Sequence, residues 1–249
     1  MIVIPMAGMS SRFFKAGYTL PKYMLEAQGE TLFWHSVKSF DKYFSSHPFL
    51  FIVKDIFDTP LFVEEQAKKL GIKNFYISIL NEDTRGQAET VALGLKTLEE
   101  QEINYSGSIT IFNIDTFRKN YKFPNLEEKG NGYLEVFRGS GNNWSYVKPK
   151  NEYTTIVIET AEKKPISNLC CTGLYHFANK DDYLLAFTSY LKKPIKEWDK
   201  GELYIAPLYN ELIAIGLEIH YELINKQDVI FCGIPQEYED FKLSNFFDF

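Results

Sequence analysis

The sequence has little cysteine and no long hydrophobic run. Its three cysteines are an odd number and two of them, Cys170 and Cys171, are adjacent, which fits neither a disulfide framework nor a zinc site. We therefore expect reduced thiols and a cytoplasmic protein. No apolar stretch reaches the roughly 20 residues that span a bilayer. No basic segment precedes the short apolar run at the N-terminus, so we expect neither a signal peptide nor a membrane partner.

Positive charge is also scarce. The chain has 27 lysines and arginines against 33 acidic residues, a net charge of −6, whereas a general nucleic-acid-binding protein has a basic surface. Neither a Walker A motif nor a G-x-G-x-x-G motif is present. Internal repeats and low-complexity linkers are absent too. What remains is a globular chain of 249 residues, long enough for a single domain over 1–249 with a substantial core.

Hydrophobic patterns alternate between strands and helices in the first half. They predict strands over 2–7, 49–53, 74–79 and 108–114, and helices over 31–44, 59–70 and 87–100. This alternation predicts right-handed βαβ crossovers, hence an α/β fold with a mostly parallel central sheet flanked by helices. Ligands of such sheets bind at the carboxyl ends of the strands. The turn after the first strand, the loop Asn81–Gly86 and Asp115 all fall at those ends.

The second half is less regular. We expect strands over 132–139, 154–160, 172–178, 217–223 and 229–232, and helices over 180–191, 205–215 and from about Glu237. The segment 138–150, which contains Gly139 and Gly141, is expected to be a loop that borders a pocket.

A small-residue turn, Ala7–Ser11, follows the first strand and is followed by Arg12 and Lys22. The backbone N–H groups of such a turn can converge on phosphate oxygens, and Gly8 lets the backbone approach a ligand closely. Alone, the turn is more often only a turn, and an arginine is more often a surface charge. Together they predict a phosphate-binding site.

The segments AGMSSR and PK resemble the signature of the nucleotidyltransferases that make NDP-sugars and CDP-activated small molecules. That signature is A-G-x-G-[ST]-R, then P-K about ten residues later. Six residues match it, and Ser10 stands where the family usually has glycine. We expect this departure to be harmless if Ser10 has a negative φ and costly if it is left-handed. The resemblance implies a Rossmann-like nucleotidyltransferase fold with a mixed, mostly parallel sheet. It also implies nucleotide contacts from Ala7, Gly8, Met9, Ser10 and Ser11.

Two further segments extend the resemblance. TRGQA, residues 84–88, resembles the base-reading loop of the family, in which Gln87 and nearby amides contact the nucleobase and Gly86 leaves room for its ring. The implied nucleotide-binding residues of this loop are Thr84, Gly86, Gln87 and Ala88. Asp115 matches a strand-end aspartate that binds Mg²⁺, the expected cofactor. Without the resemblance, a capped helix start and a turn-forming aspartate explain these segments about equally well.

The acceptor side is expected in the second half. EKKP, residues 162–165, resembles the E-K-P segment of the family, whose lysine grips the acceptor phosphate. Lys163 matches that lysine, but Lys164 precedes the proline, so the register stays open by one. Aromatic residues are more often core, yet three of them could line an acceptor pocket. These are Tyr18, Trp144 and Tyr146.

One expected feature of the family is missing. Many relatives have a second metal carboxylate in a late strand, but the corresponding segment here, residues 231–235, has no acidic residue. Either Asp115 holds the metal with phosphates and water, which suits Mg²⁺, or another acidic residue substitutes. The substitutes considered are Asp199, Glu202 and Asp228.

The resemblance implies transfer of a nucleotidyl group, with Arg12 and Lys22 as the catalytic residues. Residues 1–115 would bind the nucleotide and residues 116–249 the acceptor. Among the smaller members, the whole chain looks most like the bacterial cytidylyltransferases that transfer CMP from CTP to phosphoglutamine for capsular phosphoramidate. The alternatives are a sugar-1-phosphate nucleotidyltransferase that makes an NDP-sugar, and a catalytically inactive nucleotide-binding module. The habits of the family favour a homodimer.

Overall fold

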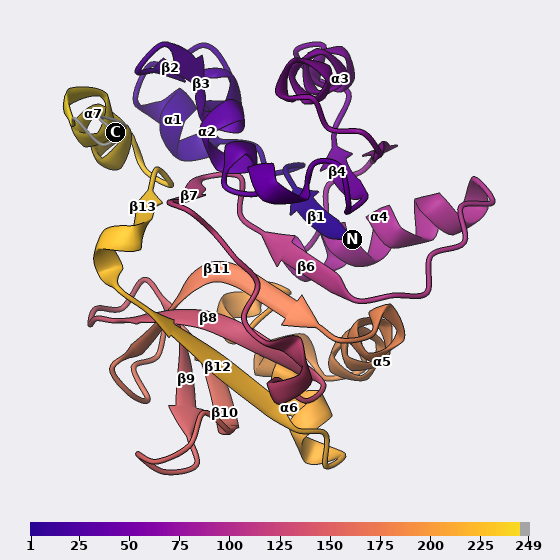
Figure 1. Cartoon of the computed structure of the whole chain (residues 1–249), viewed down its shortest axis with the longest axis vertical. Helices are drawn as coiled ribbons and strands as arrows, with labels where there is room; N and C mark the ends of the chain where they lie inside the picture. Colours follow the sequence, from indigo (N-terminus) through magenta and orange to yellow (C-terminus); the bar gives the residue numbers. More distant parts are fainter. Residues whose placement is uncertain (245–249) are drawn as a thin grey trace.

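The computed structural model describes residues 1–244, and its centre is a nine-stranded sheet (Figure 1). Seven strands form a continuous path in the order β10-β9-β11-β6-β1-β4-β5, while β8 pairs with both β11 and β12. The strands of the sheet are β1 (Ile2–Pro5), β4 (Phe49–Val53), β5 (Phe75–Ile79), β6 (Ile109–Phe112), β8 (Gly132–Arg138), β9 (Ser145–Pro149), β10 (Val157–Glu162), β11 (Leu169–Phe177) and β12 (Ile219–Ile224).

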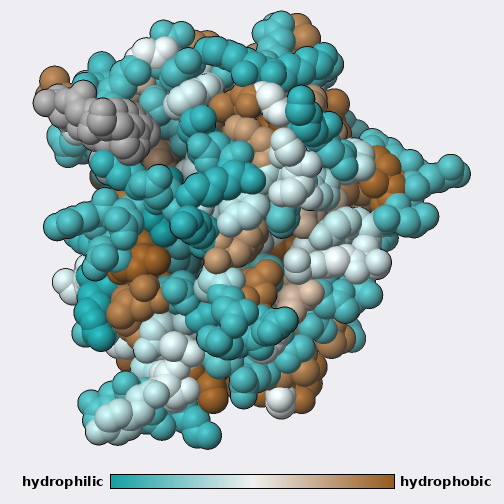
Figure 2. Space-filling view, viewed as in Figure 1, coloured by the Kyte–Doolittle hydropathy of each residue, from teal (hydrophilic) through white to brown (hydrophobic). Residues whose placement is uncertain are grey.

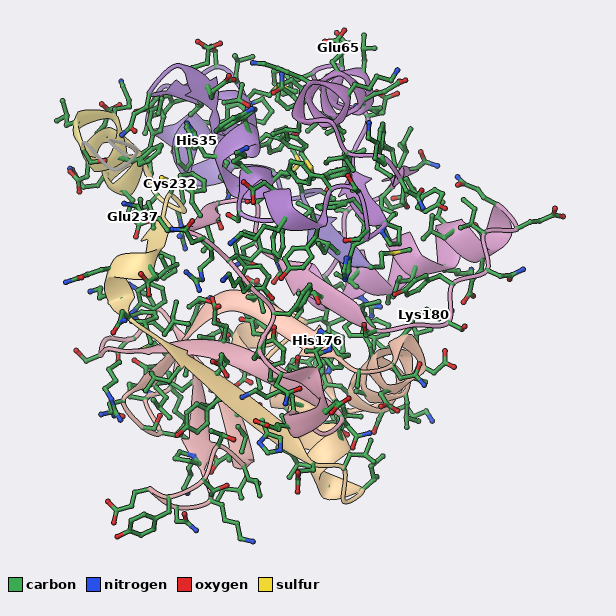
Figure 3. All side chains as sticks on the ribbon, in the orientation of Figure 1. His35, Glu65, His176, Lys180, Cys232 and Glu237 are labelled. Carbon is green, nitrogen blue, oxygen red and sulfur yellow. The ribbon has the colours of Figure 1, made fainter. Side chains whose placement is uncertain are left out.

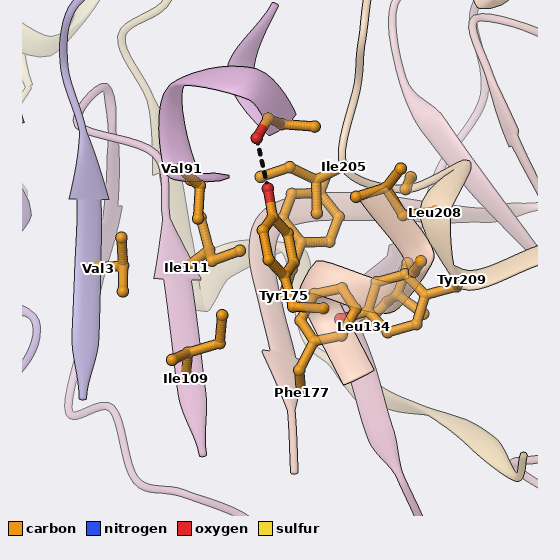
Figure 4. Close-up of a cluster of buried hydrophobic side chains, with 14 of the residues drawn as sticks. Val3, Val91, Ile109, Ile111, Leu134, Tyr175, Phe177, Ile205, Leu208 and Tyr209 are labelled. Carbon is orange, nitrogen blue, oxygen red and sulfur yellow. Dashed lines mark hydrogen bonds between the residues drawn. The ribbon is translucent and has the colours of Figure 1, made fainter. Parts of the chain in front are cut away.

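Helices cover both faces of this sheet. The helices that pack on it are α2 (Leu32–Lys38), α3 (Thr59–Leu70), α4 (Gln87–Glu100), α5 (Lys180–Leu191) and α6 (Leu208–Ala214). Successive side chains of a strand point to opposite faces. In β1, Ile2 and Ile4 therefore pack with α2 and α3, whereas Val3 packs with α4, α5 and α6. The hydrophobic cluster that contains Val3 also contains Phe177 and Tyr209, and it extends the core under the later strands (Figure 4).

The pairing of neighbouring strands changes from parallel to antiparallel in the middle of the sheet. β1 is parallel to β4 and β6, and β4 is parallel to β5, but β11 runs antiparallel to β6. In Figure 1 the two halves of the chain meet where β6 and β11 lie side by side. The predicted fold, a mixed and mostly parallel Rossmann-like sheet flanked by helices, is confirmed in its arrangement. The loops after β1 and β6 lie at the carboxyl ends of their strands, as the predicted site requires.

Local signals determined several boundaries correctly. α3 begins at Thr59 with Pro60 in its first turn and ends before Gly71, whose φ of 81° is the left-handed conformation that favours glycine at a helix end. The predicted limits of α4 and α5 are also confirmed. The predicted helix over 31–44 is wrong, because α2 stops at Lys38 and a separate 3₁₀ turn follows. That turn keeps Phe40 buried on the same face, so the hydrophobic spacing continues beyond the helix.

The predicted loop over 138–150 is wrong in its second part, where β9 pairs with β10, but its first part is a loop that borders a pocket, as expected. β13 (Val229–Phe231) lies within the predicted strand over 229–232 and pairs with β7 (Thr116–Arg118). Other short elements had no clear sequence signal. They are β7, α1 (Ser11–Lys15), the hairpin β2 (Glu26–Ala27) and β3 (Glu30–Thr31), and the 3₁₀ turns Lys22–Met24, Asp41–Tyr43, Leu126–Glu128, Ile195–Glu197, Asp199–Gly201 and Lys226–Asp228.

The last helix, α7 (Pro235–Leu243), returns to the first half of the molecule. It contacts β2 and lies beside the β2–β3 hairpin in Figure 1. It begins two residues before the predicted start because Pro235 takes its first position. The C-terminal segment β13–α7 is therefore placed against the site formed by the first half. The predicted domain ends at residue 249, and its last five residues lie outside the described part.

The face drawn in Figure 2 is mainly hydrophilic, with its hydrophobic residues in separate small groups. Within residues 1–244, no helix has both the length and the apolar character needed to cross a membrane.

Candidate active site

The turn after β1 forms one wall of a cavity of about 360 Å³. Gly8, Met9, Ser10 and Ser11 line it, whereas Ala7 packs against the hydrophobic core instead. α1 starts at Ser11, so the turn leads directly into the first helical residues. The predicted phosphate site is thus a concave surface lined by Gly8 and the hydroxyl-bearing Ser10 and Ser11, together with the exposed Met9.

Ser10 has a φ of 48° and a ψ of 29°, the left-handed conformation in which the departure from glycine was expected to be costly. Its hydroxyl oxygen also accepts a hydrogen bond, 3.1 Å long, from the backbone N–H of Lys22. Glycine at this position would relieve the strain but would lose that bond. Ser10 therefore links the turn after β1 to the segment that carries Lys22.

Arg12 is exposed and lines both this cavity and a second, adjoining one of about 560 Å³. Among the described residues it forms no ion pair. An arginine without a carboxylate partner, at the junction of two cavities, is free to bind phosphate oxygens with its planar guanidinium group.

Lys22 and Asp115 form an ion pair at the same junction, with both side chains about one-fifth exposed. Pro21 fixes an extended backbone before Lys22, and Asp115 follows β6 by three residues. Both residues line the smaller cavity, and Asp115 also lines the larger one. The carboxyl ends of β1 and β6 thus bring together a cationic and an anionic group, as the strand order predicted.

The Asp115 carboxylate offers the hard oxygen donors that Mg²⁺ prefers, and it faces the cavity. Its chemistry fits the expected cofactor. Of the substitutes considered for a second acid, Asp199, Glu202 and Asp228 line neither cavity. An acidic residue that the sequence analysis did not select, Glu237 on α7, lines the larger cavity beside Asp115.

Glu237 also stabilises the start of α7, because its Oε2 accepts hydrogen bonds from the backbone N–H groups of Gly233 (2.8 Å) and Ile234 (3.2 Å). Burial raises the pKa of the Glu237 carboxyl, those hydrogen bonds lower it, and the charge of Asp115 raises it further. No local motif marks this glutamate as part of a site, because only the pairing of β13 with β7 brings it there.

The predicted base-reading loop is only partly in the cavity. Gln87 lines the larger cavity, and its Nε2 donates to Oδ1 of Asn113 over 2.6 Å. Thr84 bonds the hydroxyl of Thr90 and Ala88 is buried, and neither lines the two cavities. Asn113 was missed, although its place two residues before Asp115 at a strand end is a usable signal.

Gly86 has a structural explanation that the sequence analysis did not anticipate. Its φ is 149°, and a Cβ there would lie 2.5 Å from the carbonyl oxygen of Leu203. The two segments exchange backbone hydrogen bonds, from Ala88 to Leu203 and from Leu203 to Arg85, each 2.9 Å long. The glycine is therefore required for close packing against the Leu203 segment, rather than only for room around a nucleobase.

The two candidate lysines of residues 162–165 differ in position. Lys163 lines the larger cavity, with its Nζ 4.4 Å from the centre of the Tyr204 ring and hydrogen-bonded to the Tyr204 hydroxyl. Lys164 is exposed and lines neither cavity. Glu162 is buried beside Lys163 and bonds Ser145. Burial raises the pKa of the Glu162 carboxyl, whereas the hydrogen bond from Ser145 and the charge of Lys163 lower it.

Only one of the three predicted aromatic walls lines the cavity. Trp144 does so and packs against Phe231, with ring centres 4.6 Å apart. Ser145 lines the cavity as well, so the next residue of the strand, Tyr146, points to the opposite face and is fully buried. Tyr18 bonds Glu239 over 2.5 Å, outside both cavities. Tyr18 and Tyr146 therefore do not line the larger cavity.

The larger cavity has further polar residues that the sequence analysis did not select as site residues. They include Ser145, Thr172, Tyr175 and Tyr204. Tyr175 lies in β11 and its hydroxyl is 3.4 Å from that of Ser145. Tyr204 comes from the loop before α6. These residues come from separate segments that only the folded chain brings together.

The cavity lined by the turn after β1 adjoins a second polar cavity, and Arg12 and Asp115 line both. Comparison with solved structures defines the class. A nucleoside-diphosphate-sugar pyrophosphorylase from Vibrio cholerae RC9 has 64% sequence identity and a TM-score of 0.96, covering 98% of this chain and 100% of its own. This chain therefore belongs to the nucleotidyltransferase family that includes the nucleoside-diphosphate-sugar pyrophosphorylases.

More distant structures share the fold. An inositol-1-phosphate CTP transferase from T. maritima has 14% identity and a TM-score of 0.69, covering 97% of this chain and 91% of its own. A UTP-bound UGPase from Acinetobacter baumannii has 13% identity and a TM-score of 0.68, with the same coverage. No protein-family model and no curated protein matches the chain.

Proposed function

We propose that the protein transfers CMP from CTP to a small phosphorylated acceptor, with release of pyrophosphate. The observation that supports this most directly is the junction of the two cavities, where Arg12 and Asp115 line both, and Lys22, which lines the smaller cavity, is paired with Asp115. A triphosphate and a phosphorylated acceptor can then meet at one cationic centre. The proposed acceptor is L-glutamine phosphate, and the proposed role is the synthesis of capsular phosphoramidate, both from the resemblance of the whole chain.

In the proposed reaction, a phosphate oxygen of the acceptor attacks the α-phosphorus of CTP. A new phosphorus–oxygen bond forms to the acceptor, and the bond from the α-phosphorus to the bridging oxygen of the β-phosphate breaks. Pyrophosphate leaves with the bonding electrons. The nucleophile is already an anion, so no general base is needed, and alignment of two anions is the main task of the enzyme.

The residues have distinct roles in this proposal. Arg12 holds the β- and γ-phosphates, and Lys22 stabilises negative charge between the α-phosphate and the acceptor. Lys163, from the far side of the larger cavity, binds the acceptor phosphate. Gln87 and Asn113 bind the base edge. Mg²⁺ held at Asp115, when bound, neutralises phosphate charge and orients the α-phosphate.

The test is pyrophosphate release measured for each of CTP, UTP, dTTP and ATP with phosphoglutamine, phosphocholine or a hexose 1-phosphate. Release with CTP and phosphoglutamine alone is the expected result. Release with a hexose 1-phosphate would instead identify an NDP-sugar-forming enzyme, and no release with any pair would leave a nucleotide-binding module. Arg12, which forms no ion pair among residues 1–244, and the intact Lys22 and Asp115 favour an active enzyme over such a module.

A further inference from the structure

A third pocket, of about 400 Å³, lies apart from the two cavities of the candidate site and shares no lining residue with either. It lies where α2 contacts β7. Trp34 and His35 of α2 and Phe117 of β7 give it aromatic walls. His35 and Phe117 are buried, whereas Trp34 is half-buried. The volume lies within the range of pockets that hold small ligands, and the proposed function does not use this pocket.

The described part of the chain ends beside this pocket. Gln28, which lines the pocket, donates from its Nε2 to the backbone carbonyl oxygens of Phe241 and Ser244, each over 2.6 Å. The Phe241 ring of α7 packs on two of the aromatic walls, with its centre 5.1 Å from that of His35 and 5.0 Å from that of Phe117. In Figure 3, His35 lies on the side of α2 that faces α7. Ser244, the last described residue, is therefore held at the edge of the pocket.

The five residues that follow Ser244 have a composition that suits a pocket with aromatic walls. Residues 245–249 have the sequence Asn-Phe-Phe-Asp-Phe. Three of the five are phenylalanines, whose burial is favourable, and the one charged residue, Asp248, is an acid. Five residues span at most about 17 Å. Their attachment to Ser244 therefore limits them to surfaces near this pocket.

The charge of the pocket also suits that segment. Two exposed lysines, Lys38 and Lys42, line the pocket, and Lys42 forms no ion pair with any residue in 1–244. Among the same residues, the two acids that line the pocket are each paired with a lysine. Asp41 lies 3.5 Å from Lys38, and Glu30 lies 2.6 Å from Lys69. A further carboxylate can therefore approach Lys42 without meeting an unpaired acid of the pocket.

We propose that residues 245–249 dock into this pocket of the same chain, with phenylalanine side chains against the aromatic walls and Asp248 beside Lys42. Because Ser244 is already held at the pocket, docking is intramolecular, and the effective concentration of the segment is in the millimolar range. A second copy of the chain or a separate protein would have to compete with that concentration. The docked segment ties α7 to α2. Since α7 directly follows Gly233 and Ile234, which line the larger cavity, docking supports one wall of the candidate active site.

The first test is a disulfide between the segment and the pocket. The full-length double variant Asp248→Cys with Lys42→Cys is oxidised, and the control pairs Asp248→Cys with Lys96→Cys. Lys96 is an exposed residue of α4, which packs on the other face of the sheet. The three native cysteines are buried and do not compete. We expect the Lys42 pair to form a disulfide within one chain at least tenfold faster than the Lys96 pair.

The mobility of the oxidised protein on a non-reducing gel separates the outcomes. Equal rates for the two cysteine pairs would overturn the proposal. A disulfide formed mainly between two chains, seen as a doubled mass, would overturn docking within the same chain and assign the pocket to a second copy.

Thermal unfolding tests whether the phenylalanines of the segment are buried. We expect the triple variant Phe246→Ser, Phe247→Ser and Phe249→Ser to unfold about 5 °C below the wild type, because burial of apolar surface is lost. Leu243→Ser is the matched control, since this apolar residue of α7 is 84% exposed and its replacement should leave the unfolding temperature unchanged. An unchanged unfolding temperature for the triple variant would overturn the proposal.

Combination of the triple variant with Trp34→Ala tests whether that loss arises at the pocket. Contacting residues have non-additive effects on stability. We therefore expect the three serine substitutions to lower the unfolding temperature of Trp34→Ala by less than they lower that of the wild type. Equal decreases in the two backgrounds would overturn the packing of the segment on Trp34. Because none of these measurements uses CTP or an acceptor, their outcome does not depend on the proposed function.

Discussion

The two halves of the site are built differently. In the first half, the phosphate turn and Asp115 directly follow parallel strands, so the edge of the sheet places them. In the second half, Lys163 follows an antiparallel strand, Trp144 precedes another, and Tyr204 comes from a loop. The comparison shows that parallel strands gather short local motifs at one edge. The antiparallel half gathers single residues through long-range pairings.

The largest effect is expected on the phosphate side of this comparison. Lys22→Ala should lower kcat about a thousandfold, because the lysine stabilises charge that develops between the two substrates. Pyrophosphate release under saturating substrates is the measurement. Lys15→Ala, an exposed lysine of α1, is the control and should keep wild-type turnover. Near-normal turnover by Lys22→Ala would show that Lys22 does not stabilise the transition state of the proposed reaction.

The protein is expected to lose stability in acid because of a histidine where β11 pairs with β6, at the boundary between the two halves. His176 of β11 is buried and bonded to Thr110 of β6 over 2.8 Å, and burial lowers its pKa to about 3. Below pH 6.5 the unfolded chain gains a proton at this histidine that the folded chain does not. Stability is therefore lost as the pH falls from 6.5 toward 3, by about 2 kcal/mol at pH 5.

Urea unfolding of the wild type and His176→Gln at pH 7 and pH 5 checks this. The variant should lose about 2 kcal/mol less of its unfolding free energy between the two pH values than the wild type. Equal losses for the two proteins would show that His176 does not govern the acid response. Figure 3 shows this histidine near the middle of the molecule, where the two halves meet.

The acceptor half offers a matched pair of lysines. Lys163→Ala should raise the KM for the acceptor about thirtyfold and leave the KM for CTP unchanged, because a charged hydrogen bond to one substrate is lost. Lys164→Ala, the exposed neighbour, should change neither. Steady-state kinetics with each substrate varied in turn is the measurement. Equal effects of the two variants, or a change in the KM for CTP instead, would contradict the assignment of Lys163 to the acceptor.

The smallest effect is expected at Ser10, where strain and hydrogen bonding oppose each other. Ser10→Ala keeps the left-handed backbone and loses the bond to Lys22, so stability should fall by about 1 kcal/mol and kcat severalfold. Ser10→Gly relieves the strain, so its stability should stay near that of the wild type while kcat falls by the same factor. Higher turnover by Ser10→Gly would show that strain, rather than the bond to Lys22, limits the enzyme.

Much of the phosphate half was predictable from the sequence. Hydrophobic periodicity and helix-end residues located α3, α4 and the early strands, and parallel order then placed Asp115 near the first turn. The short motifs could be recognised in the sequence because their residues are close in the chain. The face of the strand to which each side chain points was not predictable from the sequence. Tyr146 was therefore wrongly assigned to a pocket that its neighbour Ser145 lines. The register between Lys163 and Lys164 was open for the same reason.

The sequence by itself determined the α/β class, the phosphate turn and the resemblance to nucleotidyltransferases, because these depend on local periodicity and on motifs within about 20 residues. Only the tertiary structure decided that Ser10 is left-handed and bonded to Lys22, that Gly86 packs on Leu203, and that Glu237 reaches Asp115. These features depend on pairings between segments far apart in the chain, and the pairing of β13 with β7 brings the C-terminal helix to the site at the start of the molecule.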